Sequence, residues 1–116
     1  MSELGSLDSL PVAEPYPGLR RRSFDGAGAT VNEYVFEPGA RFPLHRHPEE
    51  QITLVVEGEV EMTIDGRTSP LRSGGWSVVA PGVEHGITAG RGGARILAIV
   101  VPRRIEADAY TLVDRL

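Results

Sequence analysis

The sequence of 116 residues contains no cysteine and no lysine. Because it has no thiol, we expect neither a disulfide nor a thiolate metal site, and this composition fits a cytoplasmic protein. The missing lysine excludes Schiff-base chemistry and a lysine general base, since all 12 basic residues are arginine. Composition alone therefore excludes several common kinds of catalytic and metal site.

Long apolar runs are also missing. The longest run, Ile96 to Val101, is far shorter than the roughly 20 residues that a membrane-spanning helix needs. No basic stretch followed by an apolar one opens the sequence, so we expect no signal peptide. The formal net charge of −4 argues against nucleic-acid binding. We therefore expect neither a membrane nor a nucleic acid as a partner.

Glycine and proline are abundant, with 14 and 9 residues. This richness favours many short strands and turns over long helices. Glu59 to Ile64 alternates polar and apolar residues, which is typical of a strand with one buried face, and Asp65-Gly66 then predicts a hairpin turn. Several such strands separated by turns indicate an all-β sandwich or barrel.

The chain is expected to form one domain. Residues 1–18 contain three prolines and no sustained periodicity, so they predict a flexible N-terminal arm or an edge strand. Residues 19–116 form the domain, with a barrel core of about 31–101. Only residues 105–116 have a pattern compatible with a short helix. The clearest expected strands cover residues 31–37, 51–56, 59–64, 76–80, 87–88 and 95–101.

The candidate chemistry lies in the three histidines, His45, His47 and His85. His45 and His47 alternate, and Gln51 has the same parity, so on an extended chain their side chains point to one face. Imidazole nitrogens suit zinc, iron, nickel, copper or cobalt. The spacing therefore predicts a site for a divalent transition metal. The alternative is that His45 and His47 are ordinary surface side chains.

Two stretches resemble the motifs of the cupin family. Residues 39–58 read GARFPLHRHPEEQITLVVEG, which is similar to the first cupin motif in its flanking glycines and its HxH pair, with Gln51 in the usual glutamate position. Residues 74–89 read GGWSVVAPGVEHGITA, which is similar to the second motif and contains His85. The resemblance covers about residues 31–101, most of the chain.

This resemblance implies a small double-stranded β-helix, or jelly roll, of the single-domain cupin type. It also implies one divalent transition metal (Zn, Ni, Fe, Mn, Co or Cu), bound inside one mouth of the barrel. The implied metal ligands are His45, His47, Gln51 and His85. Many small cupins dimerise, so a homodimer is the expected assembly.

Gln51 changes the chemistry to expect. It binds through a neutral carbonyl oxygen, so a divalent ion keeps a formal charge of about +2, where a glutamate would reduce it to about +1. Such an ion is a stronger Lewis acid and attracts anions more strongly, which favours non-redox chemistry on a carboxylate, enolate or carbonyl compound. The alternative is that Gln51 only hydrogen-bonds a ligating histidine. The neighbouring carboxylates Glu49 and Glu50 are weaker ligand candidates, because Glu50 has the wrong parity and Glu49 follows a proline.

Within the family, HxHPxEQ followed by HG resembles the pectin-degradation type, which converts unsaturated uronates to linear keto sugars. Gln-containing sites also resemble those of cupin polyketide cyclases. The uronate proteins have an acidic residue and an aromatic on the last strand and then an arginine. Here those positions are Ala98, Val100 and Arg104, so only Arg104 matches. Without an acid at position 98, the barrel has no obvious general base. The candidate catalytic residues are therefore Tyr34, as a proton donor, and Arg104.

The remaining pocket is expected to be apolar. An apolar lining around a metal suits a flat or aromatic substrate better than a sugar. We expect a metal-dependent isomerase, cyclase or lyase acting on a small anionic or aromatic compound; the alternatives are a metal or small-molecule sensor barrel and a dioxygenase. Core packing is an equal explanation for the aromatic members of the predicted lining, which comprises Phe42, Met62, Ile64, Trp76, Ala98 and Val100.

Overall fold

The computed structural model describes residues 2–106 and 109–113, and their regular structure is almost entirely β. The strands are joined by tight turns and form one curled antiparallel sheet, which confirms the all-β prediction. In the described part of the chain, no helix is long and apolar enough to span a bilayer. The elements are η1 (Leu7–Ser9), β1 (Ala13–Tyr16), β2 (Leu19–Asp25), β3 (Thr30–Phe36), β4 (Arg41–Arg46), β5 (Glu50–Ile64), β6 (Arg67–Arg72), β7 (Trp76–Val79), β8 (His85–Val101) and β9 (Thr111–Leu112).

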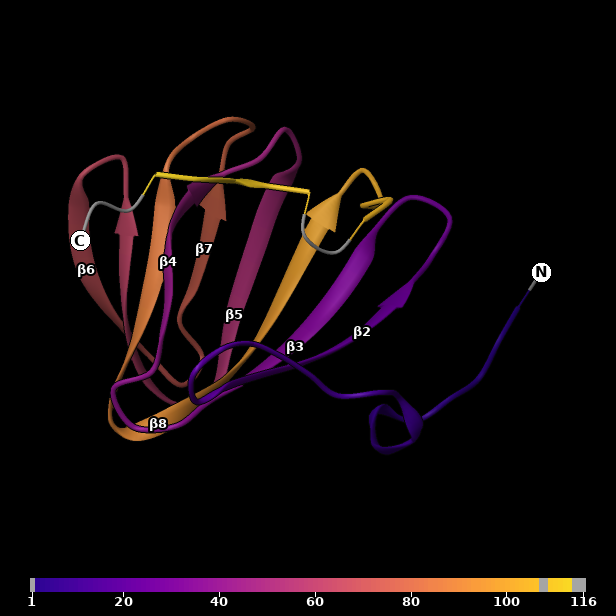
Figure 1. The fold of residues 1–116 in the computed structure, drawn as a ribbon, viewed down its shortest axis with the longest axis horizontal. Helices are drawn as coiled ribbons and strands as arrows, with labels where there is room; N and C mark the ends of the chain where they lie inside the picture. The colour runs from indigo at the N-terminus through magenta and orange to yellow at the C-terminus, as the bar shows by residue number, and fades with distance from the viewer. Residues whose placement is uncertain (1, 107–108, 114–116) are drawn as a thin grey trace.

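Two long strands, β5 and β8, pair with each other along almost their whole length, from Glu50↔Val101 to Ile64↔His85. The early half of β5 also pairs with β7, and the late half pairs with β6. The late half of β8 pairs with β3, and the early half pairs with β4. The sheet therefore has two walls that share β5 and β8, the arrangement of a jelly roll. Its strands converge at one end and splay at the other, where residues 109–113 cross the opening (Figure 1).

We name the two walls by their strands. The first wall contains β1, β2, β3, the late half of β8, the early half of β5, and β7. The second wall contains β6, the late half of β5, the early half of β8, β4 and β9. Buried apolar side chains fill the space between them, among them Phe36, Val55 and Ile96 from the first wall and Phe42 and Met62 from the second. This space is the core of the molecule.

The bend between the walls lies at a close contact of two glycines. Register shifts interrupt the β5–β8 ladder around Gly58, as β-bulges do where a strand turns from one sheet to another. Gly58 has φ +80° and Gly93 has φ +73°. A Cβ on Gly58 would overlap the carbonyl oxygen of Gly93, so only glycine fits. The expected separate strands at 51–56 and 59–64 are therefore one bent strand, and the same holds for 87–88 and 95–101.

The two ends of the chain differ from the expectation in one respect. Ala13–Tyr16 pairs with β2 as an edge strand, and the preceding residues extend away from the sheet (Figure 1). The helix expected over 105–116 is wrong for the described part of that segment, which contains β9 instead. There the backbone pairs with β4, through His45↔Leu112 and Arg46↔Thr111, so tertiary pairing overrides local preference. Residues 107, 108 and 114–116 lie outside the described residues.

Replacing Gly58 with alanine tests the bend, and Gly39→Ala is the matched control. Both glycines have positive φ, but nothing lies within 4 Å of a Cβ at Gly39. Each change carries the left-handed backbone penalty of roughly 1–2 kcal/mol. Gly58→Ala should cost about 1–3 kcal/mol more, because the chain has to move to admit the methyl group. Urea unfolding of the metal-free variants measures both losses, and equal losses would rule out the close contact as the reason for Gly58.

Candidate metal centre

The fold brings the three histidines together inside the splayed end. His45 lies in β4, and His47 is the first residue after the end of β4. His85 is the first residue of β8 and pairs in register with His45. Their exposed fractions are 4%, 3% and 1%, respectively. One ring nitrogen from each lies within 4.8 Å of those from the other two. The alternative of ordinary surface histidines is therefore wrong.

Each of the three rings is oriented by a hydrogen bond from its Nδ1. A backbone carbonyl can only accept, so Nδ1 carries the hydrogen, and the neutral ring presents Nε2 as a bare acceptor. This arrangement is how proteins orient metal-ligating histidines. The accepting carbonyl oxygens belong to Pro43, Glu49 and Val83, at 2.8, 3.0 and 2.9 Å from the Nδ1 atoms of His45, His47 and His85.

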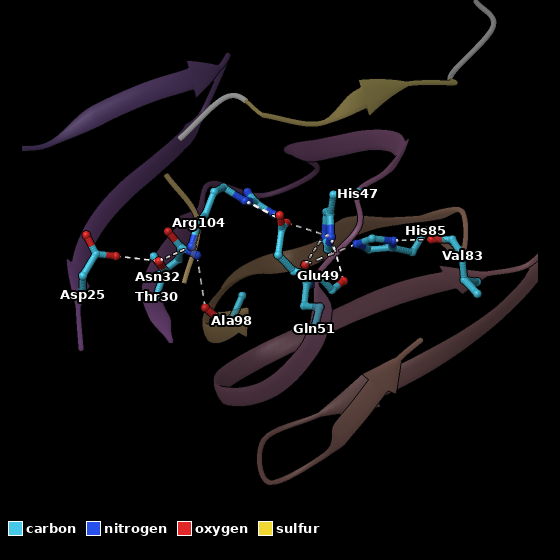
Figure 2. A network of polar contacts seen from close by, with 10 residues as sticks. All are labelled: Asp25, Thr30, Asn32, His47, Glu49, Gln51, Val83, His85, Ala98 and Arg104. Atoms are coloured by element: carbon cyan, nitrogen blue, oxygen red, sulfur yellow. Dashed lines mark hydrogen bonds and ion pairs between the residues drawn. The ribbon is translucent and has the colours of Figure 1, made fainter. Parts of the chain in front are cut away.

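Gln51 completes the group from the first wall. Its Nε2 donates to Thr53 Oγ1 at 3.0 Å, which turns its carbonyl oxygen toward the histidines. That oxygen lies 3.1 Å from His47 Nε2 and 3.2 Å from His85 Nε2 (Figure 2). All three facing atoms are acceptors, so a cation between them is the natural partner. Ligand atoms about 2.1 Å from one ion lie roughly 3.0–3.4 Å from one another, so the spacing of these nitrogen and oxygen atoms fits a transition metal.

Burial keeps the imidazoles neutral. Burial first, and the charge of the neighbouring His85 second, lowers the pKa of His45 to about 3. Burial also lowers the pKa of His85 to about 4. For His47, burial is again the largest cause of a lowered pKa, followed by the positive charge of Arg104. At neutral pH all three rings can therefore act as ligands without first losing a proton.

Arg104 reaches the site through a carboxylate that sequence reasoning set aside. Its Nε and Nη2 both donate to Glu49 Oε1, at 3.2 and 3.1 Å. The two side chains are 7% and 11% exposed, and Glu49 Oε1 lies 3.4 Å from His47 Nδ1. The chain bends at Pro48 and Glu49, so strand parity does not predict where the Glu49 side chain lies. The structure places its side chain beside Arg104, and only its backbone oxygen holds a histidine.

Aromatic rings cover the other side of His45. The ring of Phe42 lies 4.3 Å from that of His45, centroid to centroid, and the ring of Tyr110 lies 5.2 Å away. The hydroxyl of Tyr110 is 2.7 Å from that of Tyr16 in β1. A hollow of about 390 Å³ opens beside His47 and is lined partly by Tyr110. The sequence does not indicate a role for Tyr110 in the site, because its contact with His45 depends on β9 crossing the opening.

The other predicted site residues divide into two groups. Tyr34, Met62, Ala98 and Val100 are buried between the walls, and Ile64 is half-buried against the same core. Trp76 is not brought to the site: it is 67% exposed, because its neighbours Ser77 and Val79 take the inward positions of β7. Strand alternation therefore turns Trp76 to the outer face, and its predicted place in the pocket is wrong.

The structure is a bent two-walled β barrel, and its open end holds three inward histidines that could bind a metal ion. The family model described as Cupin domain (Cupin_2) matches residues 32–100. The chain belongs to the cupin family.

Solved structures share this fold at low identity. An RmlC-like cupin from Shewanella frigidimarina NCIMB 400 is 24% identical, with a TM-score of 0.83 over 90% of this chain and 95% of that one. KdgF from Halomonas sp. is 22% identical, with a TM-score of 0.84 over 90% and 97%. A variant of oxalate decarboxylase from Bacillus subtilis is 19% identical, with a TM-score of 0.85 over 94% of this chain but 32% of that one. Curated protein sequences include no match.

The lowered histidine pKa values predict a pH response of the metal-free protein. Burial disfavours the charged ring in the folded state. As the pH falls below 6.5, the ordinary pKa of histidine, the unfolded state therefore takes up protons before the folded state does. Stability should therefore decrease from about pH 6.5 toward the folded pKa of His85, about 4. Ring proton NMR of chelator-treated protein should show no titration of His45 or His85 between about pH 8 and 5. A ring that titrates near 6.5 would contradict the geometry.

Proposed function

We propose that the protein is an enzyme in which a divalent transition metal acts as a Lewis acid on a small carbonyl or carboxylate compound, in an isomerase, cyclase or lyase reaction. The observation that supports the proposal most strongly is the set of opposed acceptors, in which Gln51 Oε1 lies 3.1 Å from His47 Nε2 and 3.2 Å from His85 Nε2. The likeness in fold to a decarboxylase named for oxalate, a small dicarboxylate, is compatible with this substrate class.

A bound metal would supply Lewis acidity, withdrawing electron density from the substrate oxygen. The protein's own residues would supply orientation and shielding. The backbone carbonyls fix the three imidazoles, and Gln51 contributes a ligand atom without negative charge. The aromatic rings around His45 exclude water from one side. Tyr34 packs on Phe42, whereas Tyr110 contacts His45 directly, so Tyr110 is the better placed neutral acid.

Metal content tests the site. Protein from rich medium should contain about one transition-metal ion per chain, as one converging ligand set implies. A double variant, His45→Ala with His47→Ala, should lose the ion because two ligands are missing. Arg46→Ala is the control, since Arg46 lies between the two but is exposed and pairs with Glu84. If the double variant retains its metal, the proposed metal site is refuted. Oxygen consumption with candidate enols would instead favour dioxygenase chemistry.

We also propose a homodimer through the outer face of the first wall. On this face Leu54 pairs with Trp76 and Ile52 pairs with Val78, and all four side chains are 37–67% exposed. A twofold axis would lay these apolar rows on the same rows of a second copy. The buried carboxylate on this face, Glu33, is already paired with Arg95 at 2.7 Å. A second copy would therefore bury apolar surface without leaving that carboxylate unpaired.

Sedimentation equilibrium tests the dimer. Leu54→Arg places a charge in the middle of the apolar rows and should convert the protein to a monomer, since an unpaired charge buried in an interface is strongly unfavourable. Thr88→Arg adds the same charge at an exposed position of the second wall and should leave the assembly unchanged. If both variants have the same molar mass as the unmodified protein, whether that mass is the dimer's or the monomer's, the outer face of the first wall is not a dimer interface.

A further inference from the structure

A continuous set of polar contacts leads from the edge of the first wall to the histidines. Thr30 Oγ1 donates to Asp25 Oδ1 at 2.5 Å and accepts from the backbone N–H of Arg104 at 2.9 Å. The Arg104 side chain then extends to Glu49, which lies against His47 (Figure 2). The start of this arginine is therefore fixed on β3, and its charged end is fixed beside the candidate metal ligands.

The guanidinium edge of Arg104 is occupied by Glu49. The edge formed by Nε and Nη2 is a planar pair of donors that suits a carboxylate, and here both donors meet Glu49 Oε1, at 3.2 and 3.1 Å. Both side chains are about nine-tenths buried. A buried charge that loses its partner is strongly destabilised, so Arg104 does not release Glu49 without a replacement anion.

Glu49 is positioned from its own side as well. Its backbone oxygen accepts from His47 Nδ1 at 3.0 Å, and its Oε1 lies 3.4 Å from the same nitrogen. The next residue, Glu50, begins β5 with the opposite parity to the buried Gln51 and is half-buried. Two adjacent carboxylates of the same size thus have different positions: one pairs with the site's arginine and the other lies on the far side of the strand.

We propose that Glu49 is a specificity-determining residue: it serves as an internal carboxylate for Arg104, so the site takes a neutral carbonyl or enol compound in preference to one that needs Arg104 for its carboxylate. The proposal rests on the proposed function, because it concerns the ligand of that same site. The Glu49–Arg104 pair removes a cation that would otherwise attract carboxylates in addition to a bound metal ion.

Ligand affinity of the metal-loaded protein tests the proposal with a matched pair of probes, benzoate and benzamide, measured by isothermal titration calorimetry. Glu49→Gln keeps the side-chain size but removes the negative charge of Glu49 from Arg104. It should raise the affinity for benzoate about tenfold or more, the worth of a charge-assisted hydrogen bond, and change that for benzamide little. Glu50→Gln alters the net charge equally and should leave both affinities unchanged.

Two further variants show that the gain depends on Arg104. Combining Glu49→Gln with Arg104→Leu should abolish the gain for benzoate. Glu49→Asp keeps the charge but withdraws the carboxylate from the guanidinium, so it should raise the benzoate affinity by a smaller factor. This variant also replaces Glu49→Gln in the test if Glu49→Gln does not fold. A benzoate affinity unchanged in these Glu49 variants, or raised equally by Glu50→Gln, would overturn the proposal.

The same titrations on chelator-treated protein separate this proposal from the metal function. Arg104 and Glu49 pair without any metal in the structure, so Glu49→Gln should still favour benzoate over benzamide there. Suppose that Glu49→Gln raises the benzoate affinity without metal and that the unmodified protein contains almost no metal. This result would refute the metal function and support the role of Glu49. Normal metal content with no gain would refute the role of Glu49 alone.

Discussion

The meeting of hydrogen-bond acceptors at the open end is the constraint on which the rest of the structure depends. Three imidazoles donate through Nδ1 to backbone carbonyls, and Gln51 donates through its amide nitrogen to Thr53, so every available donor points outward. The atoms left facing inward all accept. Such an arrangement is unfavourable in a dry interior unless a cation lies among them, because unpaired buried acceptors are costly. The polar atoms are therefore arranged for an ion, and the fold has to hold them in place against their mutual repulsion.

The bend of β5 and β8 makes this arrangement geometrically attainable. Gln51 and Ile64 are 13 positions apart on one strand, which would separate them by about 43 Å if the strand were straight. Ile64 pairs with His85, yet the Gln51 oxygen lies 3.2 Å from His85 Nε2. The chain therefore has to fold back on itself between these residues, and it does so where Gly58 meets Gly93. The bend at Gly58 is therefore what brings Gln51 to the candidate metal ligand His85.

Sequence reasoning reached the features that depend on local periodicity and missed those that depend on distant contacts. The HxH alternation predicted that His45 and His47 share a face, and strand parity correctly placed Met62 inside. The sequence predicts Trp76 either in the pocket lining or in the core, but a strand of four residues does not reveal which parity faces inward. Tyr110 approaches His45 only because β9 pairs with β4. No local pattern around residue 110 indicates that pairing.

In the stretch HRHPEEQ, the buried negative charge is paired with Arg104 and is not carried by the residue that faces the histidine Nε2 atoms. Cupin motifs resembling this one have a glutamate at the position of Gln51, where its charge would fall on the metal. Here the nearest buried carboxylate is Glu49, two residues earlier, and its charge falls on Arg104. A carboxylate at position 51 would weaken the Lewis acidity of a bound ion, whereas the neutral Gln51 would leave that acidity strong and Glu49 occupies the arginine. Chemistry that activates a neutral oxygen is the kind of reaction such a distribution of charge serves best.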